Sequence, residues 1–395
     1  MDITIQPRRL QGQVQIIPSK SQAHRLLICA AFADRETALV CPATNNDIAA
    51  TAACLQALGA KITRTEREYR ITPIAQIPQC AVLNCGESGS TLRFLLPIVG
   101  ALGVDGIFEL EGRLSERPLS PLWEEMERMG CKLEWLDTNR LRCCGQLHSG
   151  LYRIDGAVSS QFITGLLFAA TLMEGHSTIE IMGKLESKDY VTMTQQAMAL
   201  FGVQTGNFSV TGGQSYRSPG EIAIEGDWSN GAFWLVARAL GNHVEVLGLD
   251  ESSFQGDRAV LPILAQMRTG HIQVDATNIP DLVPVLAVAA CALQGATFTG
   301  IRRLRLKESD RVASTIAMIE HLGGRAEATE DTLTVHSGKF RGGIVDACND
   351  HRIAMAAAIA ATVCSERVSI LGAQCVGKSY PDFWKEYKLL GGNYA

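Results

Sequence analysis

The sequence predicts an α/β protein made of six repeated units, and three observations support this fold class. Six times, a short polar cluster opens a helix-length run that is apolar on every side, and such a helix must be buried. Each run is followed by a β-rich segment and then by a second helix with apolar residues at i, i+3, i+4 and i+7. The runs start at residues 19, 87, 159, 229, 280 and 349. A period of about 50 to 70 residues indicates a repeat architecture.

The six apolar runs begin with polar residues that suit helix N-termini. In chain order they are SKSQAHRLLICAAFA from Ser19, ESGSTLRFLLPIVGALG from Glu87, SSQFITGLLFAATLMEG from Ser159, SNGAFWLVARALG from Ser229, PDLVPVLAVAACALQG from Pro280 and NDHRIAMAAAIAATV from Asn349. Helix N-termini present unpaired N–H groups and a positive dipole end, so they favour anions. Four clusters also carry basic residues, namely Lys20 with Arg25, Arg93, Arg352 and, more distantly, Arg238. The pattern therefore predicts an anionic ligand.

The second helix of each unit is predicted to be half-exposed, because its apolar residues follow one face. These helices are expected within residues 46–62, 120–133, 188–202, 256–268, 309–324 and 380–392. Strands are expected after the buried helices at 176–183, 243–249, 296–301 and 367–372, and after the second helices at 68–74, 140–145 and 332–338. The short interval between residues 229 and 280 indicates that the fourth unit is trimmed.

Length and composition bound the domain number and the partners. A chain of 395 residues is too long for one ordinary core, and six repeats fit two domains of three. The expected break lies near Ile224–Asp227, giving one domain from 1–18 with 227–395 and another from 19–226. A net charge of −5 disfavours non-specific nucleic-acid binding. We expect no secretory signal in MDITIQPRRLQG and no membrane span.

Cysteine usage indicates a reducing compartment. The twelve cysteines are scattered, with no CxxC pair and no Cys/His cluster. Reduced thiols in a cytoplasmic protein explain this better than disulfides or zinc. We therefore expect a cytoplasmic protein without a metal or other cofactor.

Two charged clusters indicate a site. Residues 302–311, RRLRLKESDR, place five basic residues at a strand-to-helix turn, where α/β proteins build sites. Arg352 lies in the first turn of an otherwise apolar helix, and a charge there is costly unless it is paired. Nearby, Asp281 and Glu308 are candidates for proton transfer. These groups predict a substrate with two or more negative charges.

The segment GAQCVGKS at 372–379 matches the GxxxxGK[ST] phosphate loop after a strand-like stretch. A nucleotide-binding loop needs a helix directly after it and further strands that carry a metal-binding Asp, but only sixteen residues follow Ser379. We therefore reject nucleotide binding, although Lys378 can still meet an anion.

Eight motifs together resemble one family. PSKSQAHR, GESGSTLR, SERPL, DGAVSSQF, IPD, LKESDR, NDHR and GKSYPDF occur in the order found in the 5-enolpyruvylshikimate-3-phosphate synthase family. The resemblance covers essentially the whole chain. It implies the two-domain enolpyruvyl transferase fold, in which each domain has three βαβαββ repeats with buried parallel helices, an inside-out α/β barrel. It also implies transfer of the enolpyruvyl group of phosphoenolpyruvate to the 5-hydroxyl of shikimate 3-phosphate, with release of phosphate, by a monomer.

The resemblance implies the following site residues. Shikimate 3-phosphate would be bound by Lys20, Ser21, Arg25, Ser159, Ser160, Gln161, Ser187, Tyr190, Asp281 and Lys307. Phosphoenolpyruvate would be bound by Lys20, Gly89, Arg93, Arg117, Gln161, Arg311, Arg352 and Lys378. Asp281 would deprotonate the 5-hydroxyl, and Glu308 or Lys20 would protonate C3 of phosphoenolpyruvate. Closure of the two domains would then exclude water from the cleft between them. No chemical role is implied for Ser229.

The chain departs from the family pattern at two positions. Glu87 stands where the loop usually has Asn, which adds a negative charge beside the anion site, and Arg303 stands where some members have Asn.

Three other functions fit the sequence less well. The sister enzyme that acts on UDP-N-acetylglucosamine usually carries a Cys in the loop before its Arg-Pro, and EGRLSERPLSP has none. A silent homologue that only binds an anionic metabolite would not need Asp281 and Glu308. A nucleotide-binding protein fits least well, for the reason given above.

Overall fold

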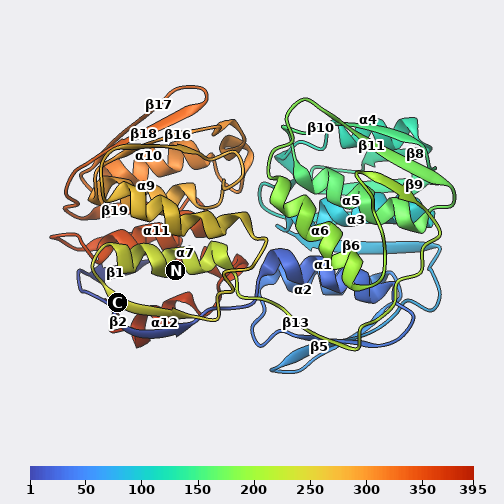
Figure 1. The fold of residues 1–395 in the computed structure, drawn as a ribbon, viewed down its shortest axis with the longest axis horizontal. Coiled ribbons are helices and arrows are strands. Elements are labelled where there is room, and N and C mark those ends of the chain that lie inside the picture. Colours follow the sequence, from blue (N-terminus) through green and yellow to red (C-terminus); the bar gives the residue numbers. More distant parts are fainter. The chain divides into compact units, whose positions relative to one another are not determined.

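The computed structural model describes residues 1–395, and contacts within the chain divide it into two compact units. Unit 1 comprises Met1–Ile17 and Glu225–Ala395, and unit 2 comprises Pro18–Ile224. In each unit, helices run side by side on the inside and strands lie around them (Figure 1). The predicted α/β fold with two three-repeat domains is confirmed.

The six apolar runs form buried helices, as predicted. They are α1 (Lys20–Ala31), α3 (Gly89–Leu102) and α5 (Ser160–Leu172) in unit 2, and α7 (Trp228–Ala239), α9 (Val283–Ala292) and α11 (His351–Ala361) in unit 1. All eleven residues of α11 are buried. Helices α3 and α5 pack so closely that a Cβ on Gly165 would lie 2.3 Å from the backbone oxygen of Arg93. Only glycine fits at that contact.

Side-chain caps start most of these helices. Ser19, Ser88, Ser159, Asp227 and Asp350 each accept a backbone N–H from the first turn. The fifth run differs from the others, because α9 has no side-chain cap.

The complete repeat has the order strand, buried helix, strand, half-exposed helix, strand, strand. In unit 2 it is β6 (Cys80–Gly86), α3, β7 (Asp105–Leu110), α4 (Leu122–Arg128), β8 (Cys131–Trp135) and β9 (Arg140–Gly145). In unit 1 it is β15 (Ile272–Asp275), α9, β16 (Ala296–Thr299), α10 (Arg311–His321), β17 (Arg325–Ala328) and β18 (Thr332–His336). The two strands that flank the buried helix pair in parallel, and the last two strands pair antiparallel.

Distant strands complete one sheet in each unit. In unit 2, β13 (Glu221–Ala223) pairs in parallel with β3 (Thr37–Val40), whose sheet continues into β5 (Glu68–Thr72) and β4 (Lys61–Arg64). In unit 1, β1 (Ile3–Gln6) joins β19 (Gly343–Asp346), β20 (Val368–Leu371) and β21 (Asn393–Tyr394). The first and last parts of each unit therefore meet in one sheet.

The third and the fourth repeat are shorter than the complete one. The third consists of β10 (Leu151–Asp155), α5, β11 (His176–Met182), α6 (Lys188–Leu200) and β12 (Ser209–Thr211). The fourth has only β2 (Gln11–Gln15) and β14 (His243–Leu247) around α7, followed by α8 (Val260–Met267). The predicted trimming of the fourth unit is confirmed.

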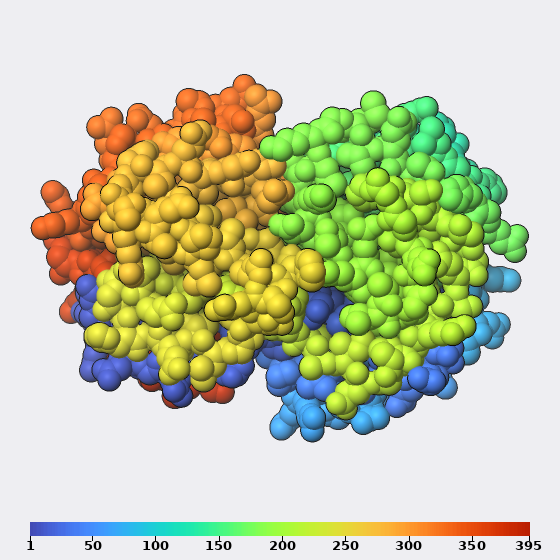
Figure 2. Space-filling model, viewed as in Figure 1, coloured from blue at the N-terminus to red at the C-terminus, as the bar shows by residue number.

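Half-exposed helices pack against the buried ones. Figure 2 shows the surface of one face of the molecule, coloured along the chain. The two not yet placed are α2 (Asn46–Ala57) and α12 (Phe383–Leu389). No helix is both long and apolar enough to cross a membrane. The segment that matches a phosphate loop forms a 3-10 helix, Ala373–Lys378, instead of a loop that leads directly into an α-helix, which agrees with the rejection of nucleotide binding.

Candidate active site

Arg311 lies at the centre of a charged cluster in unit 1. Asp310 caps α10 by accepting the N–H groups of Val312 and Ala313 at 3.1 Å. Arg311 is therefore the first helical residue, and its side chain is only 1% exposed. A guanidinium buried to that degree is stable only with close anionic partners.

Three carboxylates supply the partners of Arg311. Nη1 lies 2.6 Å from Asp281 Oδ1, Nη2 lies 2.7 Å from Glu308 Oε2, and Nε lies 2.8 Å from Asp350 Oδ2. The Ser309 hydroxyl also donates to Asp350 Oδ2 at 3.0 Å. One cation thus fixes both carboxylates that the sequence nominates for proton transfer.

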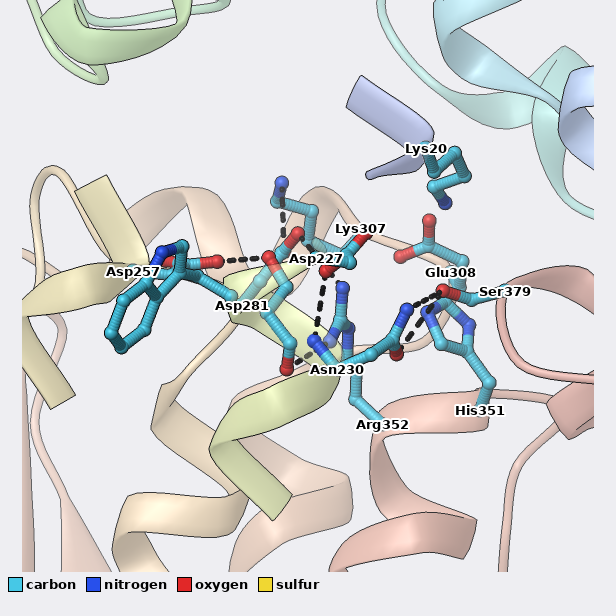
Figure 3. Close-up of polar contacts among 12 residues, drawn as sticks. Lys20, Asp227, Asn230, Asp257, Asp281, Lys307, Glu308, His351, Arg352 and Ser379 are labelled. Atoms are coloured by element: carbon cyan, nitrogen blue, oxygen red, sulfur yellow. Dashed lines mark hydrogen bonds and ion pairs between the residues drawn. The ribbon is translucent and has the colours of Figure 1, made fainter. Parts of the chain in front are cut away.

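Two further cations flank Asp281 (Figure 3). Lys307 Nζ lies 3.6 Å from Oδ1, and Arg352 Nη2 lies 3.5 Å from Oδ2. Burial lowers the pKa of Lys307 to about 8, and the negative charge of Asp281 opposes that shift. The 23% exposure of the Asp281 side chain leaves this carboxylate accessible from one side.

Arg352 is held at the start of α11. Its backbone N–H donates to Asp350 Oδ1 at 2.9 Å, and its Nη1 donates to the backbone oxygen of Ser229 at 2.9 Å. Its guanidinium carbon lies 5.8 Å from the centre of the Phe233 ring, a cation–π distance. The buried charge of Arg352 was predicted to need a partner. Protein groups meet this need in part, and Nε of Arg352 has no hydrogen-bond partner.

Lys378 and Arg303 contact backbone oxygens at the edges of this cluster. Lys378 Nζ donates to the oxygen of Asn349 at 2.7 Å, next to the buried Asp350. Arg303 Nη2 donates to the oxygen of Thr277 at 2.8 Å. Asn349 has φ of 53°, a strained value at the turn that Lys378 contacts.

Ser229 has a structural function that the sequence did not reveal. Its backbone oxygen holds Arg352, and its hydroxyl donates to Asp257 Oδ2. These contacts are structural and add to the sequence prediction, which assigned no chemical role to Ser229.

In unit 2, Lys20 begins α1 and forms an ion pair with Asp47. The Lys20 Nζ to Asp47 Oδ2 distance is 2.9 Å, and the side chains are 16% and 15% exposed. Asp47 lies in the first turn of α2, next to the cap Asn45. The ion pair therefore joins the starts of two helices.

Arg25 lies in the interior of unit 2, where it joins α1 to α6. Its Nε donates to the Thr194 hydroxyl at 2.8 Å, Nη1 to the oxygen of Ser21 at 2.5 Å, and Nη2 to the oxygen of Tyr190 at 2.9 Å. Burial lowers the pKa of Arg25 to about 10. Ser187, which precedes α6, has φ of 54°, so this end of α6 is built from both a strained turn and a buried arginine.

A second group in unit 2 gathers around the start of α3. Arg93 Nη1 donates to Gln161 Oε1 at 2.8 Å, and Gln161 Nε2 donates to the Ser90 hydroxyl at 3.0 Å. A Cβ on Gly89 would lie 2.9 Å from Arg117 Nη1. Two guanidinium groups therefore converge over a glycine at a helix N-terminus, an arrangement suited to an anion.

The remaining nominated residues lie at the start of α5. Ser159 caps the helix through its hydroxyl, and Ser160 is its first residue, only 6% exposed. The caps that the sequence nominated as anion donors thus also serve the helices themselves.

Sequence reasoning missed Asp47, Asp257 and the role of Asp350 as a partner of Arg311. Each contributes through a residue distant in the sequence, so no local motif marks it. For Asp257, the sequence shows only an acidic residue at a helix start, in Gly256-Asp257-Arg258. Such a residue usually stabilises the helix start and does not by itself indicate a site.

Comparisons with known proteins agree on one family. The family model for EPSP synthase (3-phosphoshikimate 1-carboxyvinyltransferase) matches residues 5–387. The 3-phosphoshikimate 1-carboxyvinyltransferase of Clostridium kluyveri is 39% identical, with 99% of this chain and 97% of that protein covered. The one from Clostridium acetobutylicum is 37% identical at the same coverage.

Solved structures with low sequence identity share the fold. EPSP synthase from Acinetobacter baumannii superposes with a TM-score of 0.82 at 22% identity, covering 100% of this chain and 99% of that one. The enolpyruvyl transferase NikO from Streptomyces tendae gives 0.76 at 17% identity, covering 100% and 98%. With an ordered charged cluster in each unit and relatives matched over nearly their full length, this chain belongs to the EPSP synthase (3-phosphoshikimate 1-carboxyvinyltransferase) family.

Proposed function

We propose that this chain transfers the enolpyruvyl group of phosphoenolpyruvate to the 5-hydroxyl of shikimate 3-phosphate and releases phosphate. The observation that carries the proposal is the cluster in which Arg311 holds Asp281 and Glu308 at 2.6 and 2.7 Å. A pure anion-binding protein would gain nothing from carboxylates placed among its cations, whereas proton transfer requires them.

Phosphoenolpyruvate is bound in this proposal by cations from both units. Its ligands are Lys20, Gly89, Arg93, Arg117 and Gln161 from unit 2, and Arg311, Arg352 and Lys378 from unit 1. Guanidinium groups match carboxylate and phosphate oxygens with two parallel hydrogen bonds, a geometry that lysine cannot reproduce.

Shikimate 3-phosphate is bound in this proposal mainly by hydroxyl, amide and ammonium groups. Its ligands are Lys20, Ser21, Ser159, Ser160, Gln161, Ser187, Tyr190, Asp281 and Lys307. Arg25 is assigned to the same substrate, and its three hydrogen bonds to Ser21, Tyr190 and Thr194 give it a second task of positioning.

The proposed reaction is an addition followed by an elimination. Asp281 takes the proton of the 5-hydroxyl while that oxygen bonds to C2 of phosphoenolpyruvate, and Glu308 or Lys20 gives a proton to C3. In the second step C3 returns a proton to the protein, the C2–C3 double bond forms again, and the bond from C2 to the phosphate oxygen breaks. Phosphate leaves with the electron pair of that bond.

A phosphate-release assay tests the proposal. Purified protein is incubated with phosphoenolpyruvate and either shikimate 3-phosphate or UDP-N-acetylglucosamine, and the enolpyruvyl product is identified by mass spectrometry. We expect turnover only with shikimate 3-phosphate. Turnover with the nucleotide sugar alone would assign the sister reaction instead, and phosphate release without an enolpyruvyl product would contradict the transfer.

We also propose that the chain acts as a monomer in the cytoplasm. Support comes from the fact that both sets of proposed ligands belong to one chain, so no second copy has to supply a residue. Activity that falls more steeply than protein concentration on dilution, together with a dimer mass in light scattering, would contradict the monomer. Recovery of the protein in a membrane or secreted fraction would contradict the location.

A further inference from the structure

Asp257 is a buried carboxylate that the proposed reaction does not use. It lies in the 3-10 turn Gly256–Ala259 and is 1% exposed. The turn is fixed beneath α7 by Gln255, whose side chain accepts the N–H of Trp228 at 3.0 Å and donates to the oxygen of Gly226 at 2.8 Å. The position of Asp257 is therefore determined by the same segment that starts α7.

Packing alone does not explain Asp257. Its Oδ2 accepts the Ser229 hydroxyl, whereas its buried Oδ1 has no hydrogen-bond partner. A buried polar atom left in this state costs free energy, and an apolar side chain of similar volume would avoid that cost. Burial and, to a smaller extent, the nearby charge of Asp281 raise the pKa of Asp257 to about 7.

Three successive contacts connect Asp257 to the proposed base, and Figure 3 shows Asp257, Arg352 and Asp281 among the polar residues of this region. Asp257 binds Ser229, the oxygen of Ser229 accepts Arg352 Nη1 at 2.9 Å, and Arg352 Nη2 lies 3.5 Å from Asp281 Oδ2. Asp257 and Ser229 belong to the fourth repeat, whereas Asp281 and Arg352 belong to the fifth and sixth. Each is anchored at a helix start, so a change at Asp257 is transmitted through rigid elements to Arg352 and Asp281.

We propose that Asp257 is a positioning residue of the enolpyruvyl transfer: through Ser229 it holds Arg352 beside Asp281, and its negative charge keeps Asp281 able to accept a proton. This inference rests on the proposed function. It adds a buried carboxylate behind the substrate-contacting residues, which no motif of the sequence marks.

The charges around Asp257 decide the sign of its effect. Asp281, Asp227 and Arg352 face it electrostatically, together with the Ser229 hydroxyl. Asp281 is in turn flanked by the cations Lys307, Arg311 and Arg352. A negative charge on Asp257 therefore opposes the positive charge of the three cations around Asp281.

Asp257→Asn tests the electrostatic part, because the amide keeps the shape and can still accept the Ser229 hydroxyl. We expect kcat to fall about three- to tenfold, with little change in the KM for phosphoenolpyruvate. The loss should appear above about pH 7, where wild-type Asp257 is ionised, and the two proteins should converge below that pH, because position 257 then carries no charge in either of them. Equal kcat of the variant and the wild type at pH 8 would overturn the proposal.

Ser229→Ala tests the mechanical part. Loss of the hydroxyl frees Asp257 from the α7 start and loosens the backbone oxygen that holds Arg352. We expect the KM for phosphoenolpyruvate to rise about three- to tenfold, with the acidic limb of the pH profile in its wild-type position. Wild-type kinetics in this variant would overturn the link from Asp257 to Arg352.

Controls distinguish a failure of this inference from a loss of the fold and from a failure of the proposed function. Glu251→Gln removes an exposed negative charge nearby and should behave as wild type. Thermal unfolding identifies any variant that has lost its fold, and in that case the Ser229→Ala result decides. Absence of turnover in the wild-type protein would refute the proposed function, whereas an active wild type with an unaffected Asp257→Asn variant would refute only this inference.

Discussion

The two units of this chain carry the same repeat but place different chemistry at their helix starts. In unit 1, one buried arginine binds three carboxylates, Asp281, Glu308 and Asp350. In unit 2, the buried Arg25 donates to one hydroxyl and two backbone oxygens. The carboxylates bound by the arginine of unit 1 can exchange protons. An arginine that donates only to neutral oxygens serves to fix the positions of its neighbours.

Two buried acids of unit 1 and one partly exposed acid of unit 2 differ in the direction of their pKa shifts. In unit 1, burial raises the pKa of both Asp257 and Glu386 to about 7. In unit 2, hydrogen bonds from Arg142 hold the pKa of Asp105 below its usual value. In the proposed mechanism the carboxylates that exchange protons belong to unit 1, whereas unit 2 supplies Lys20 and the groups that orient the substrates.

Removing one cation from each unit should give the largest effects. Lys20→Met in unit 2 and Arg352→Ala in unit 1 should each lower kcat/KM by about 10³-fold or more, since both remove charge that stabilises a transition state. Steady-state kinetics with both substrates measures this loss, and circular dichroism should show a retained fold.

Matched controls for this pair are Lys132→Met and Arg325→Ala, whose side chains are 71% and 73% exposed. Both should keep wild-type kinetics. Normal turnover in Lys20→Met or Arg352→Ala would show that the anion ligands are misassigned in that unit.

Gly89→Ala should impair only the phosphoenolpyruvate side of unit 2. The added Cβ would lie 2.9 Å from Arg117 Nη1 and 3.2 Å from Arg93 Nη1, so both guanidinium groups have to shift. We expect the KM for phosphoenolpyruvate to rise about tenfold and the KM for shikimate 3-phosphate to change much less. Gly270→Ala, where a Cβ meets nothing within 4 Å, is the control. An equal rise in both KM values would contradict the assignment.

The smallest expected effect concerns stability against pH. Burial raises the pKa of Glu386 in unit 1 from 4.5 to about 7. Between these two pH values the unfolded chain releases this proton while the native protein keeps it, so stability falls as pH rises through this window. Glu386→Gln keeps an acceptor for Tyr380 and should raise the melting temperature at pH 8 but not at pH 4.5.

Glu330→Gln, at an 80% exposed side chain, is the control for Glu386→Gln. Asp105 in unit 2 acts in the opposite direction, because a lowered pKa contributes stability that is lost as pH falls. An equal difference in melting temperature between Glu386→Gln and wild type at both pH values would contradict the buried, protonated Glu386.

The sequence was sufficient to predict the six buried helices, because an all-round apolar run has only one stable environment. It also revealed that the fourth repeat is trimmed, since a missing strand pair shortens the chain. The residues now grouped around Arg311 were nominated from charge in the 302–311 segment and from the family motifs.

The partners of those residues could not be predicted. Asp350 lies far from Arg311 in sequence and has a valid local role as the cap of α11, so nothing in the chain indicates its second bond. Asp47 likewise has a local role in the first turn of α2 and a second one as the partner of Lys20. Pairing across repeats depends on how helices pack, which periodicity does not encode.

The strand pairing of unit 1 has a consequence for synthesis on the ribosome. Strand β1 is made first, but its partners are Val368–Leu371 and Asn393–Tyr394. Unit 2 lies entirely between them in the chain and contains all the strands it needs. Domains generally fold as units during translation, so unit 2 can fold while β1 waits. Until β20 and β21 are made, the unpaired edges of β1 are open to pairing with other chains.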